Sequence, residues 1–427
     1  MFQRKLLPIL NELLDEFRIV YLTGPRQAGK TTLAKEIAQI SSMDYVSLDD
    51  SSVLASAKND PHGFIQTFEN KKIIIDEFQY APELVPAIKE ASDKLKPDFK
   101  GKFFLTGSAD IFRSAKTQEA LPGHMARVEL YPLSLSELSG NRRNIMDYFL
   151  TADFGSNNSP TITKEQLAQQ IINGGYPEIQ NKSKRAQQIW FKSYMEGRLL
   201  KDFESLYAAR GDYYSKIQAL VPYLAGISSN LLKYSSISND LAIDEKTIKS
   251  YVEILDLMFI VRRLPPYLKN RSKRLIQMSK IQFIDTGLAC HLLGLRTPQQ
   301  LVSSPYYGAF LENFIYLELL KQSGWCDNEV ELFHFRDNRK NEVDLVIEQG
   351  NGDITGIEVK ASSTISERDF RGLRVLSGFA GNKFARGILI YTGQEILPFR
   401  FDDKHFFALP ISLLYPLVCS NRIGFIK

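Results

Sequence analysis

Short apolar runs alternate with amphipathic segments over about the first third of the chain. Four of these runs, at residues 17–24, 44–50, 71–81 and 101–108, end in a polar or glycine-containing turn. Residues 29–40, between the first two runs, have the apolar spacing of a helix. This alternation predicts an α/β fold in which a parallel sheet carries flanking helices and presents ligand positions at the carboxyl ends of its strands.

The middle of the chain has a different pattern, because helical spacing of apolar residues dominates from Lys164 to about Phe259. Residues 235–264 are typical of two helices joined by a tight turn, and Asp244 is a fair N-cap for the second helix. Residues 260–285 then favour a strand, a basic loop and a second strand. The order of these elements predicts a helical segment followed by a winged-helix-like one.

The pattern changes again after about Pro305. A helix is predicted at residues 307–322, followed by strands at 330–337, 341–349 and 353–362. The sequence Gly-Asn-Gly-Asp between the last two strands favours a hairpin. Further strand runs, at residues 385–393 and 406–414, complete a second α/β region that is separate from the first.

Composition sets outer limits on the kind of protein. A chain of 427 residues is long enough for two to four domains, and its net charge of +4 does not by itself argue for a nucleic-acid partner. The three cysteines have no paired spacing, which indicates reduced thiols. No apolar run reaches the roughly 18–20 residues of a membrane helix, and acids occur early in the chain. We therefore expect a cytoplasmic protein without a membrane segment.

The turn after the first predicted strand fits the phosphate-loop pattern G-x-x-x-x-G-K-[ST] in its strand–loop–helix context. Its glycines would let backbone N–H groups face phosphates, and the helix N-terminus would add positive potential. Lys30 would reach the β and γ phosphates, and the Thr31 hydroxyl would bind Mg²⁺. The expected nucleotide-binding residues are Gly24, Pro25, Arg26, Gln27, Ala28, Gly29, Lys30, Thr31 and Thr32.

Two acids end the third predicted strand and complete the expected site. Asp76 would hold Mg²⁺, and Glu77 would orient or deprotonate the attacking water. The fourth strand ends in Thr106 and Ser108, and either hydroxyl could contact the γ-phosphate or the attacking water. A hydroxyl that only satisfies a strand end is the alternative.

With these motifs in place, the chain resembles a prokaryotic family of AAA-like ATPases that carries a C-terminal domain of unknown function. The resemblance covers essentially the whole chain and includes GPRQAGKTTLA, LDD, IIIDEFQYAPELVPAIKEASD, FFLTGS and LPGHMARVELYPLSLSE, followed by NGGYPE, RLLKDF and ISNDLAIDEKTIKSYVEILDLMFIVRRLPPY. It implies ATP as the nucleotide. It also implies an ATPase domain at residues 1–150, a helical lid with a winged-helix-like segment at 151–300, and a restriction-endonuclease-like domain at 301–427.

An arginine finger would stabilise charge on the γ-phosphate. Arg127 is our first choice for this role and Arg113 the second, and a structural salt bridge is the alternative for either arginine. Relatives often place arginine directly after the glycine of the Leu-Pro-Gly stretch, whereas this chain has His124 there. An arginine supplied by a neighbouring copy would imply a homo-oligomer.

The C-terminal region contains residues that resemble the PD-(D/E)XK nuclease pattern. Glu358 and Lys360 are two apart on one strand and face the same side, and the hairpin can bring Asp344 beside them. Glu312 on the preceding helix could add a third carboxylate. Such carboxylates suit Mg²⁺ or Mn²⁺, and the predicted metal ligands here are Asp344, Glu358 and Glu312. The metal would polarise the scissile phosphate and activate water, and Lys360 would stabilise charge or help to activate that water. A nuclease-shaped domain that has lost activity is the alternative.

A basic segment from Arg262 to Lys280 lies within the winged-helix-like part. Its seven cations occur without an intervening acid, which would suit contact with a DNA backbone. A protein–protein or interdomain module is the competing interpretation. The sequence thus leaves three hypotheses: an ATPase switch that acts on a partner, an ATP-regulated nuclease, and a DNA-binding regulator that does not cut.

Overall fold

The computed structural model describes residues 2–109, 125–141, 143–154, 162–199, 203, 213–274 and 277–415. The chain divides into two compact units. The first comprises Met1–Leu133 with the short segments Tyr176–Glu178 and Glu253–Ile260, and the second comprises the remainder. This division groups the middle and C-terminal regions together, so the boundaries expected near residues 150 and 300 stay predictions.

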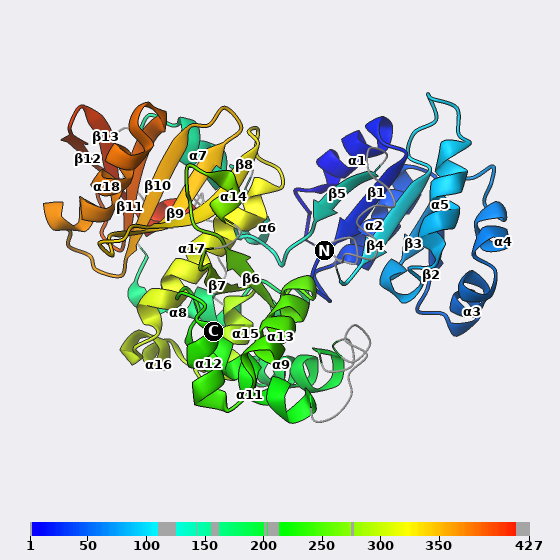
Figure 1. Ribbon diagram of the computed structural model, residues 1–427, viewed down its shortest axis with the longest axis horizontal. Coiled ribbons are helices and arrows are strands. Elements are labelled where there is room, and N and C mark those ends of the chain that lie inside the picture. Colours follow the sequence, from blue (N-terminus) through cyan, green and yellow to red (C-terminus); the bar gives the residue numbers. More distant parts are fainter. Residues whose placement is uncertain are drawn as a thin grey trace. The chain divides into compact units, whose positions relative to one another are not determined.

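The first unit is built on a five-stranded parallel sheet (Figure 1). The strand order is β2-β3-β4-β1-β5, and Ile19 of β1 lies opposite Phe103 of β4 and Met125 of β5. This confirms the predicted parallel sheet. Its strands are β1 (Ile19–Thr23), β2 (Asp44–Ser47), β3 (Ile73–Asp76), β4 (Phe103–Gly107) and β5 (Met125–Glu129).

Helices cover both faces of this sheet because side chains alternate along its buried strands. Val20 and Leu22 join one core cluster with residues of α1 and α2. Ile19 and Tyr21 join another with residues of α3, α4 and α5. These helices are α1 (Leu7–Glu16), α2 (Lys30–Ile40), α3 (Ser51–Asn59), α4 (Pro61–Gln66) and α5 (Leu84–Asp93). Burial on both faces explains why the central strands appear in the sequence as continuous apolar runs.

The helical part of the middle region contains the expected pair of helices and tight turn. The backbone N–H of Thr247 donates to Asp244 Oδ2 at 3.1 Å, which confirms the predicted cap of α13. The short strands β6 and β7 then pair antiparallel, with Arg262 opposite Gln282. The elements of this region are α6 (Leu135–Ser139), α7 (Ile145–Thr151), α8 (Lys164–Asn173), α9 (Lys184–Ser193), α11 (Tyr213–Gly226), α12 (Tyr234–Leu241), α13 (Glu245–Leu257), β6 (Val261–Leu264), α14 (Arg271–Arg274), β7 (Lys280–Phe283), α15 (Thr286–Leu292) and α16 (Pro298–Ser303).

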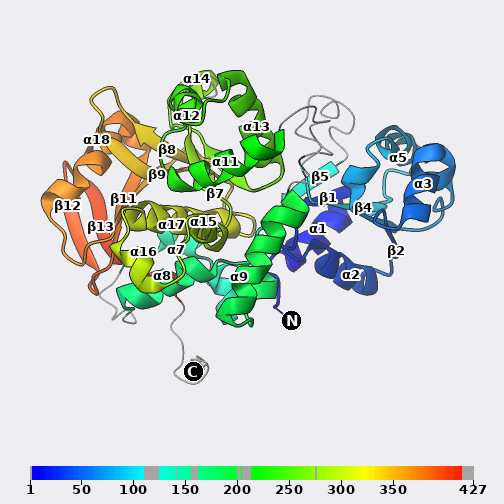
Figure 2. The ribbon, with the colours of Figure 1, turned by 90° about the horizontal axis from the view of Figure 1, so that it is seen from below.

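The C-terminal region contains a six-stranded mixed sheet of order β12-β13-β11-β10-β9-β8. The predicted hairpin is present, since β9 and β10 pair antiparallel with Ile357 opposite Leu345. Leu373 and Leu376 of α18 join Val343 in one core cluster, and α17 lies beside the sheet in both views (Figures 1 and 2). The elements are α17 (Tyr307–Ser323), β8 (Val330–Arg336), β9 (Glu342–Gln349), β10 (Ile354–Lys360), α18 (Arg371–Ala380), β11 (Phe384–Tyr391), β12 (Leu397–Phe401) and β13 (Lys404–Pro410).

Short helical turns complete the described chain. They are the 3₁₀ turns η1 (Phe78–Tyr80), η3 (Pro177–Ile179), η5 (Glu367–Phe370), η6 (Gly381–Lys383) and η7 (Ile411–Leu414), and the π-helical turn η4 (Tyr194–Leu199). The last strand predicted at residues 406–414 therefore ends at Pro410 and continues as η7.

Candidate functional site

The predicted phosphate loop connects β1 to α2, as the sequence motif requires. Gly24 has a φ of 153°, and a Cβ placed on it would lie 2.0 Å from the Leu130 carbonyl oxygen. Gly29, directly before α2, has a φ of 101°. Both backbone conformations are open to glycine and strained for other residues. The motif's two glycines are therefore explained by the path of the backbone.

Two cations organise the loop. The Lys30 ammonium is buried and donates to the carbonyl oxygens of Gly24 and Pro25, both at 2.9 Å. Arg4 donates from Nη1 to the Ala28 carbonyl at 2.6 Å and from Nη2 to the Tyr131 carbonyl at 2.7 Å. Sequence reasoning missed Arg4, which precedes the loop by some twenty residues and belongs to no motif. The Lys30 ammonium thus lies against the phosphate loop, the part of the molecule in which it was predicted to bind the β and γ phosphates.

Asp76 lies at the centre of a hydrogen-bonded set at the carboxyl end of β3. Thr31 donates to its Oδ2 at 2.9 Å, Tyr45 donates to the same oxygen at 2.6 Å, and Thr106 donates to its Oδ1. Burial, followed by the bond to Asp76, raises the pKa of Tyr45, so the phenol keeps its proton and remains a donor. The structure therefore brings Thr31 and Asp76 together, the two groups predicted to bind Mg²⁺. Their hard oxygen atoms fit such an ion.

Glu77 is held by a residue that the sequence analysis did not single out. Gln79 donates from Nε2 to Glu77 Oε2 and to Ser108 Oγ, the latter at 2.9 Å. The backbone N–H of Ser108 donates back to Gln79 Oε1 at 3.1 Å. Glu77 itself has a positive φ of 57°, a strained conformation that recurs at functional sites. Thr106 thus contacts the Asp76 side of the site, and Ser108 contacts the Glu77 side through Gln79.

The remaining predicted residues of this site have varied surroundings. Arg26 donates to the Tyr80 hydroxyl, Gln27 has a φ of 61°, and Thr32 is exposed on α2. Arg127 lies on β5 and pairs with Glu129 at 2.8 Å. Arg113 and His124 lie outside the described residues. The assignment of an arginine finger stays a prediction.

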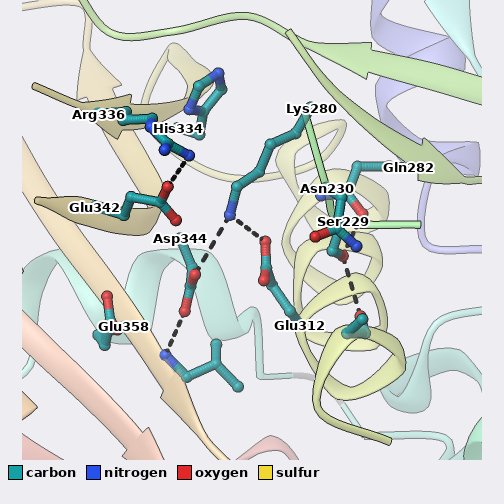
Figure 3. Close-up of polar contacts among 12 residues, drawn as sticks. Ser229, Asn230, Lys280, Gln282, Glu312, His334, Arg336, Glu342, Asp344 and Glu358 are labelled. Carbon is teal, nitrogen blue, oxygen red and sulfur yellow. Dashed lines mark hydrogen bonds and ion pairs between the residues drawn. The ribbon is translucent and has the colours of Figure 1, made fainter. Parts of the chain in front are cut away.

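The second predicted site is an acidic cluster, which we define as Glu312 of α17, Asp344 of β9 and Glu358 of β10 (Figure 3). Lys280 of β7 extends into it, and its ammonium lies 2.7 Å from Glu312 Oε1 and 3.3 Å from Asp344 Oδ1. The Lys360 ammonium lies 3.0 Å from Glu358 Oε1. The sequence motif anticipated all of these residues except Lys280, which it had placed among the DNA-contacting cations.

Burial dominates the electrostatics of the acidic cluster. It raises the pKa of Glu358 to about 8, and the Asp344 charge adds to this shift. Burial and Asp344 also raise the pKa of Glu312 well above its ordinary value. Burial acts to lower the pKa of Lys280, but the Glu312 and Asp344 charges outweigh it and the pKa rises. The Lys280 ammonium is therefore charged at neutral pH.

A hollow of about 320 Å³ borders Glu358 and Lys360. Exposed cations from the β8–β9 turn, from η5 and from the start of α18 share its lining with Glu342 and Asp369. These cations are Arg339, Lys340, Arg368 and Arg371. Basic side chains thus line much of the hollow, which reaches the acidic cluster at Glu358.

The basic segment does not present all of its cations to solvent. Arg262, Arg274 and Lys280 are buried. Arg274 forms two hydrogen bonds with Glu348, one of them at 3.3 Å, and Lys280 faces the acidic cluster. Burial argues against contact of these three residues with a nucleic-acid backbone, and DNA contact through the rest of the segment stays a prediction. Arg263 is partly exposed, and Lys269 and Arg271 are exposed.

His334 provides a pH-dependent test of the packing around Lys280. Burial lowers the pKa of His334 to about 4 from an ordinary value of 6.5, and the Lys280 charge adds to the shift. An unfolded chain therefore takes up a proton near pH 6.5 that the folded chain refuses until about pH 4, so stability falls as the pH falls through this window. We expect His334→Gln to remove about 2 kcal/mol of the stability loss between pH 7 and pH 5.

Urea unfolding at the two pH values measures this difference. His405→Gln, at an exposed position, is the control and should keep the acid sensitivity of the wild type. Equal losses of stability in the wild type and His334→Gln would contradict the prediction.

Two further expectations concern the whole chain. Within the described ranges, no helix has the length and apolar content needed to cross a membrane. Cys290 and Cys326 are free thiols, and burial raises the pKa of both. The third cysteine, Cys419, lies outside the described residues.

Comparison with protein families defines the class of the N-terminal region. Residues 16–139 match the model of an AAA domain, residues 164–299 match a domain of unknown function (DUF8612), and residues 307–414 match a domain of unknown function (DUF4143). The chain thus has an AAA-type P-loop ATPase domain followed by a DUF4143 domain. The winged-helix-like and restriction-endonuclease-like interpretations stay predictions.

Individual relatives are also similar over most of the chain. Uncharacterized protein Rv2008c of Mycobacterium tuberculosis and Uncharacterized protein Mb2031c of Mycobacterium bovis are each 27% identical over 390 residues, which cover 91% of this chain and 80% of theirs. Among solved structures, the Walker-type ATPase of Pyrococcus abyssi aligns with a TM-score of 0.42 at 14% identity, over 69% of this chain and 96% of that one. AMPPCP-bound DnaA from Aquifex aeolicus aligns with a TM-score of 0.27 at 14% identity, over 59% of this chain and 85% of that one.

Proposed function

We propose that this protein binds and hydrolyses ATP at the phosphate loop and uses the nucleotide as a switch. The observation that carries the proposal is the hydrogen-bonded set beside the loop, in which Asp76 joins Thr31 to Thr106 and Gln79 joins Glu77 to Ser108. These groups come from several elements that the sheet brings together at the carboxyl ends of its strands. An isolated glycine-rich turn would not require such an arrangement.

The roles of the residues follow from their chemistry. The glycine-permitted loop would offer backbone N–H groups to the phosphates, and the Lys30 ammonium would add positive charge there. Thr31 and Asp76 would hold Mg²⁺, which when bound neutralises charge on the β and γ phosphates. Glu77 would accept a proton from the attacking water.

The switch would work through the hydrogen bonds that Lys30 and Gln79 make in the structure. The Lys30 ammonium donates two of its three N–H groups to the Gly24 and Pro25 carbonyls, and a bound phosphate would compete for these donors. Gln79 binds one oxygen of the Glu77 carboxylate, so a water bound at Glu77 would compete with or reorient this bond. Because Gln79 also bonds Ser108, this exchange would change the backbone at Ser108 and Ala109, directly after β4. Hydrogen exchange with and without a non-hydrolysable ATP analogue should show altered protection at residues 106–109.

Glu77→Gln separates nucleotide binding from hydrolysis. The amide keeps the size of the side chain but cannot accept the proton, so we expect turnover to fall at least about 100-fold. ATP affinity should change little, because Glu77 has no assigned phosphate contact. Phosphate release and binding of a fluorescent ATP analogue measure the two quantities. Glu83→Gln, at an exposed position of the next turn, is the matched control, and wild-type turnover in Glu77→Gln would refute this role.

A further inference from the structure

The acidic cluster already has a cation of the protein's own. Lys280 is nearly excluded from solvent, with 6% of its side chain exposed, and its ammonium lies between Glu312 and Asp344. Glu312 and Asp344 have only 13% and 15% of their side chains exposed. Buried carboxylates require a compensating charge or hydrogen-bond donors, and one ammonium supplies both. The ion pairs of Lys280 with Glu312 and Asp344 are therefore part of the packed interior of the fold.

The position of Lys280 is fixed by its backbone. The residue starts β7, lies opposite Leu264 of β6 and forms an isolated bridge with Leu231. Neighbouring bonds fix the same region. Ser229 donates to Gln282 Oε1 at 2.8 Å (Figure 3), and the Leu232 N–H donates to the Ser279 carbonyl at 2.8 Å. Two strands and the segment 229–232 thus hold the lysine stem in place.

Four carboxylate oxygens of the acidic cluster already accept hydrogen bonds, whereas Glu358 Oε2 is buried without a hydrogen-bond partner among the residues that the structure describes. Asp344 Oδ1 and Glu312 Oε1 face Lys280, and Asp344 Oδ2 accepts from the Val359 N–H at 2.9 Å. Glu358 Oε1 accepts from Lys360 at 3.0 Å. Mg²⁺ requires oxygen ligands at about 2.0–2.1 Å in near-octahedral geometry. Among the residues that the structure describes, no three His, Cys, Asp or Glu side chains are grouped to hold a metal ion.

We infer that the Lys280 ammonium is the resident cation of the acidic cluster and stands where a nuclease of this shape would hold a divalent metal. The residues present do not fit a resident Mg²⁺ or Mn²⁺. The C-terminal sheet then has the outline of a nuclease site that is closed by an internal ion pair. This inference does not rest on the proposed ATPase, which uses a different unit of the chain.

Manganese binding to the full-length protein tests the inference directly. The background protein carries Asp76→Asn, which weakens Mn²⁺ binding at the nucleotide site. Titration followed by electron paramagnetic resonance counts the Mn²⁺ ions bound by this protein with and without the further change Asp344→Asn. We expect the same number of bound ions in both proteins. One Mn²⁺ fewer in the Asp344→Asn protein would overturn the inference, as would Mn²⁺-dependent cleavage of DNA that Asp344→Asn abolishes.

Removing the lysine provides the complementary test. Lys280→Met leaves two buried carboxylates without their cation, so its melting temperature should fall by several degrees in EDTA. It should also gain one Mn²⁺ that a further Asp344→Asn change removes. Lys269→Met, at an exposed position of the same segment, is the control for both readouts. A folded Lys280→Met protein without the added Mn²⁺ would overturn the inference, and the wild-type titration stays decisive if that variant does not fold.

Discussion

Lys30→Ala is expected to reduce ATP turnover by about 100-fold or more. The ammonium is buried against the phosphate loop, 2.9 Å from two of its carbonyl oxygens, so it needs only a local rearrangement to meet a bound phosphate. Removal of a preorganised charge from a site that excludes water typically costs two to three orders of magnitude in rate. ATP affinity should fall as well, because the same charge binds the ground-state phosphates. Phosphate release and nucleotide binding measure the two losses.

The control for Lys30→Ala is Lys58→Ala, at an exposed position in the last turn of α3. It should retain wild-type turnover. Thermal unfolding of Lys30→Ala checks that the sheet remains folded, since the variant removes two hydrogen bonds to the loop. Wild-type turnover in a folded Lys30→Ala protein would place hydrolysis at some other site.

Arg274→Met is expected to lower the free energy of unfolding by about 3–5 kcal/mol, the usual cost of breaking a buried ion pair. Arg274 has 7% of its side chain exposed, and its partner Glu348 has 10%. The guanidinium also lies over two aromatic rings, 4.4 Å from the Phe333 centroid and 5.0 Å from the Tyr267 centroid. Methionine would fill part of the space but would leave the Glu348 carboxylate buried without its main partner. Urea unfolding measures the loss.

Arg271→Met is the matched control, because Arg271 approaches the same carboxylate at 3.6 Å with 74% of its side chain exposed. An exposed pair contributes little, so we expect a loss below about 1 kcal/mol. The comparison holds residue type, partner and segment constant, and contrasts a buried, ring-stacked arginine with an exposed one. Equal losses in the two variants would contradict a structural role for Arg274.

How far each contact of the phosphate site reaches along the chain explains how much of the site could be predicted. The phosphate loop was predictable because its chemistry is local: two glycines, a lysine and a threonine occupy fixed positions between one strand and one helix. The contact between Thr31 and Asp76 was also predictable, since the carboxyl ends of parallel strands meet at one edge of the sheet. Tyr45 and Arg4 were not, because each reaches the site from a segment without a motif.

The sequence by itself determined the local elements, the parallel sheet of the first unit and the residue types of both candidate sites. Periodicity and turn residues act over a few positions, so they can be recognised from the sequence alone. Only the tertiary structure decided which charges are buried and which partners they meet. Lys280 and Asp344 are 64 positions apart, and Arg271 and Arg274 share one basic run but differ in burial. A charged side chain stabilises the fold when elements distant in sequence bury it beside a partner, and the local sequence pattern does not predict such burial.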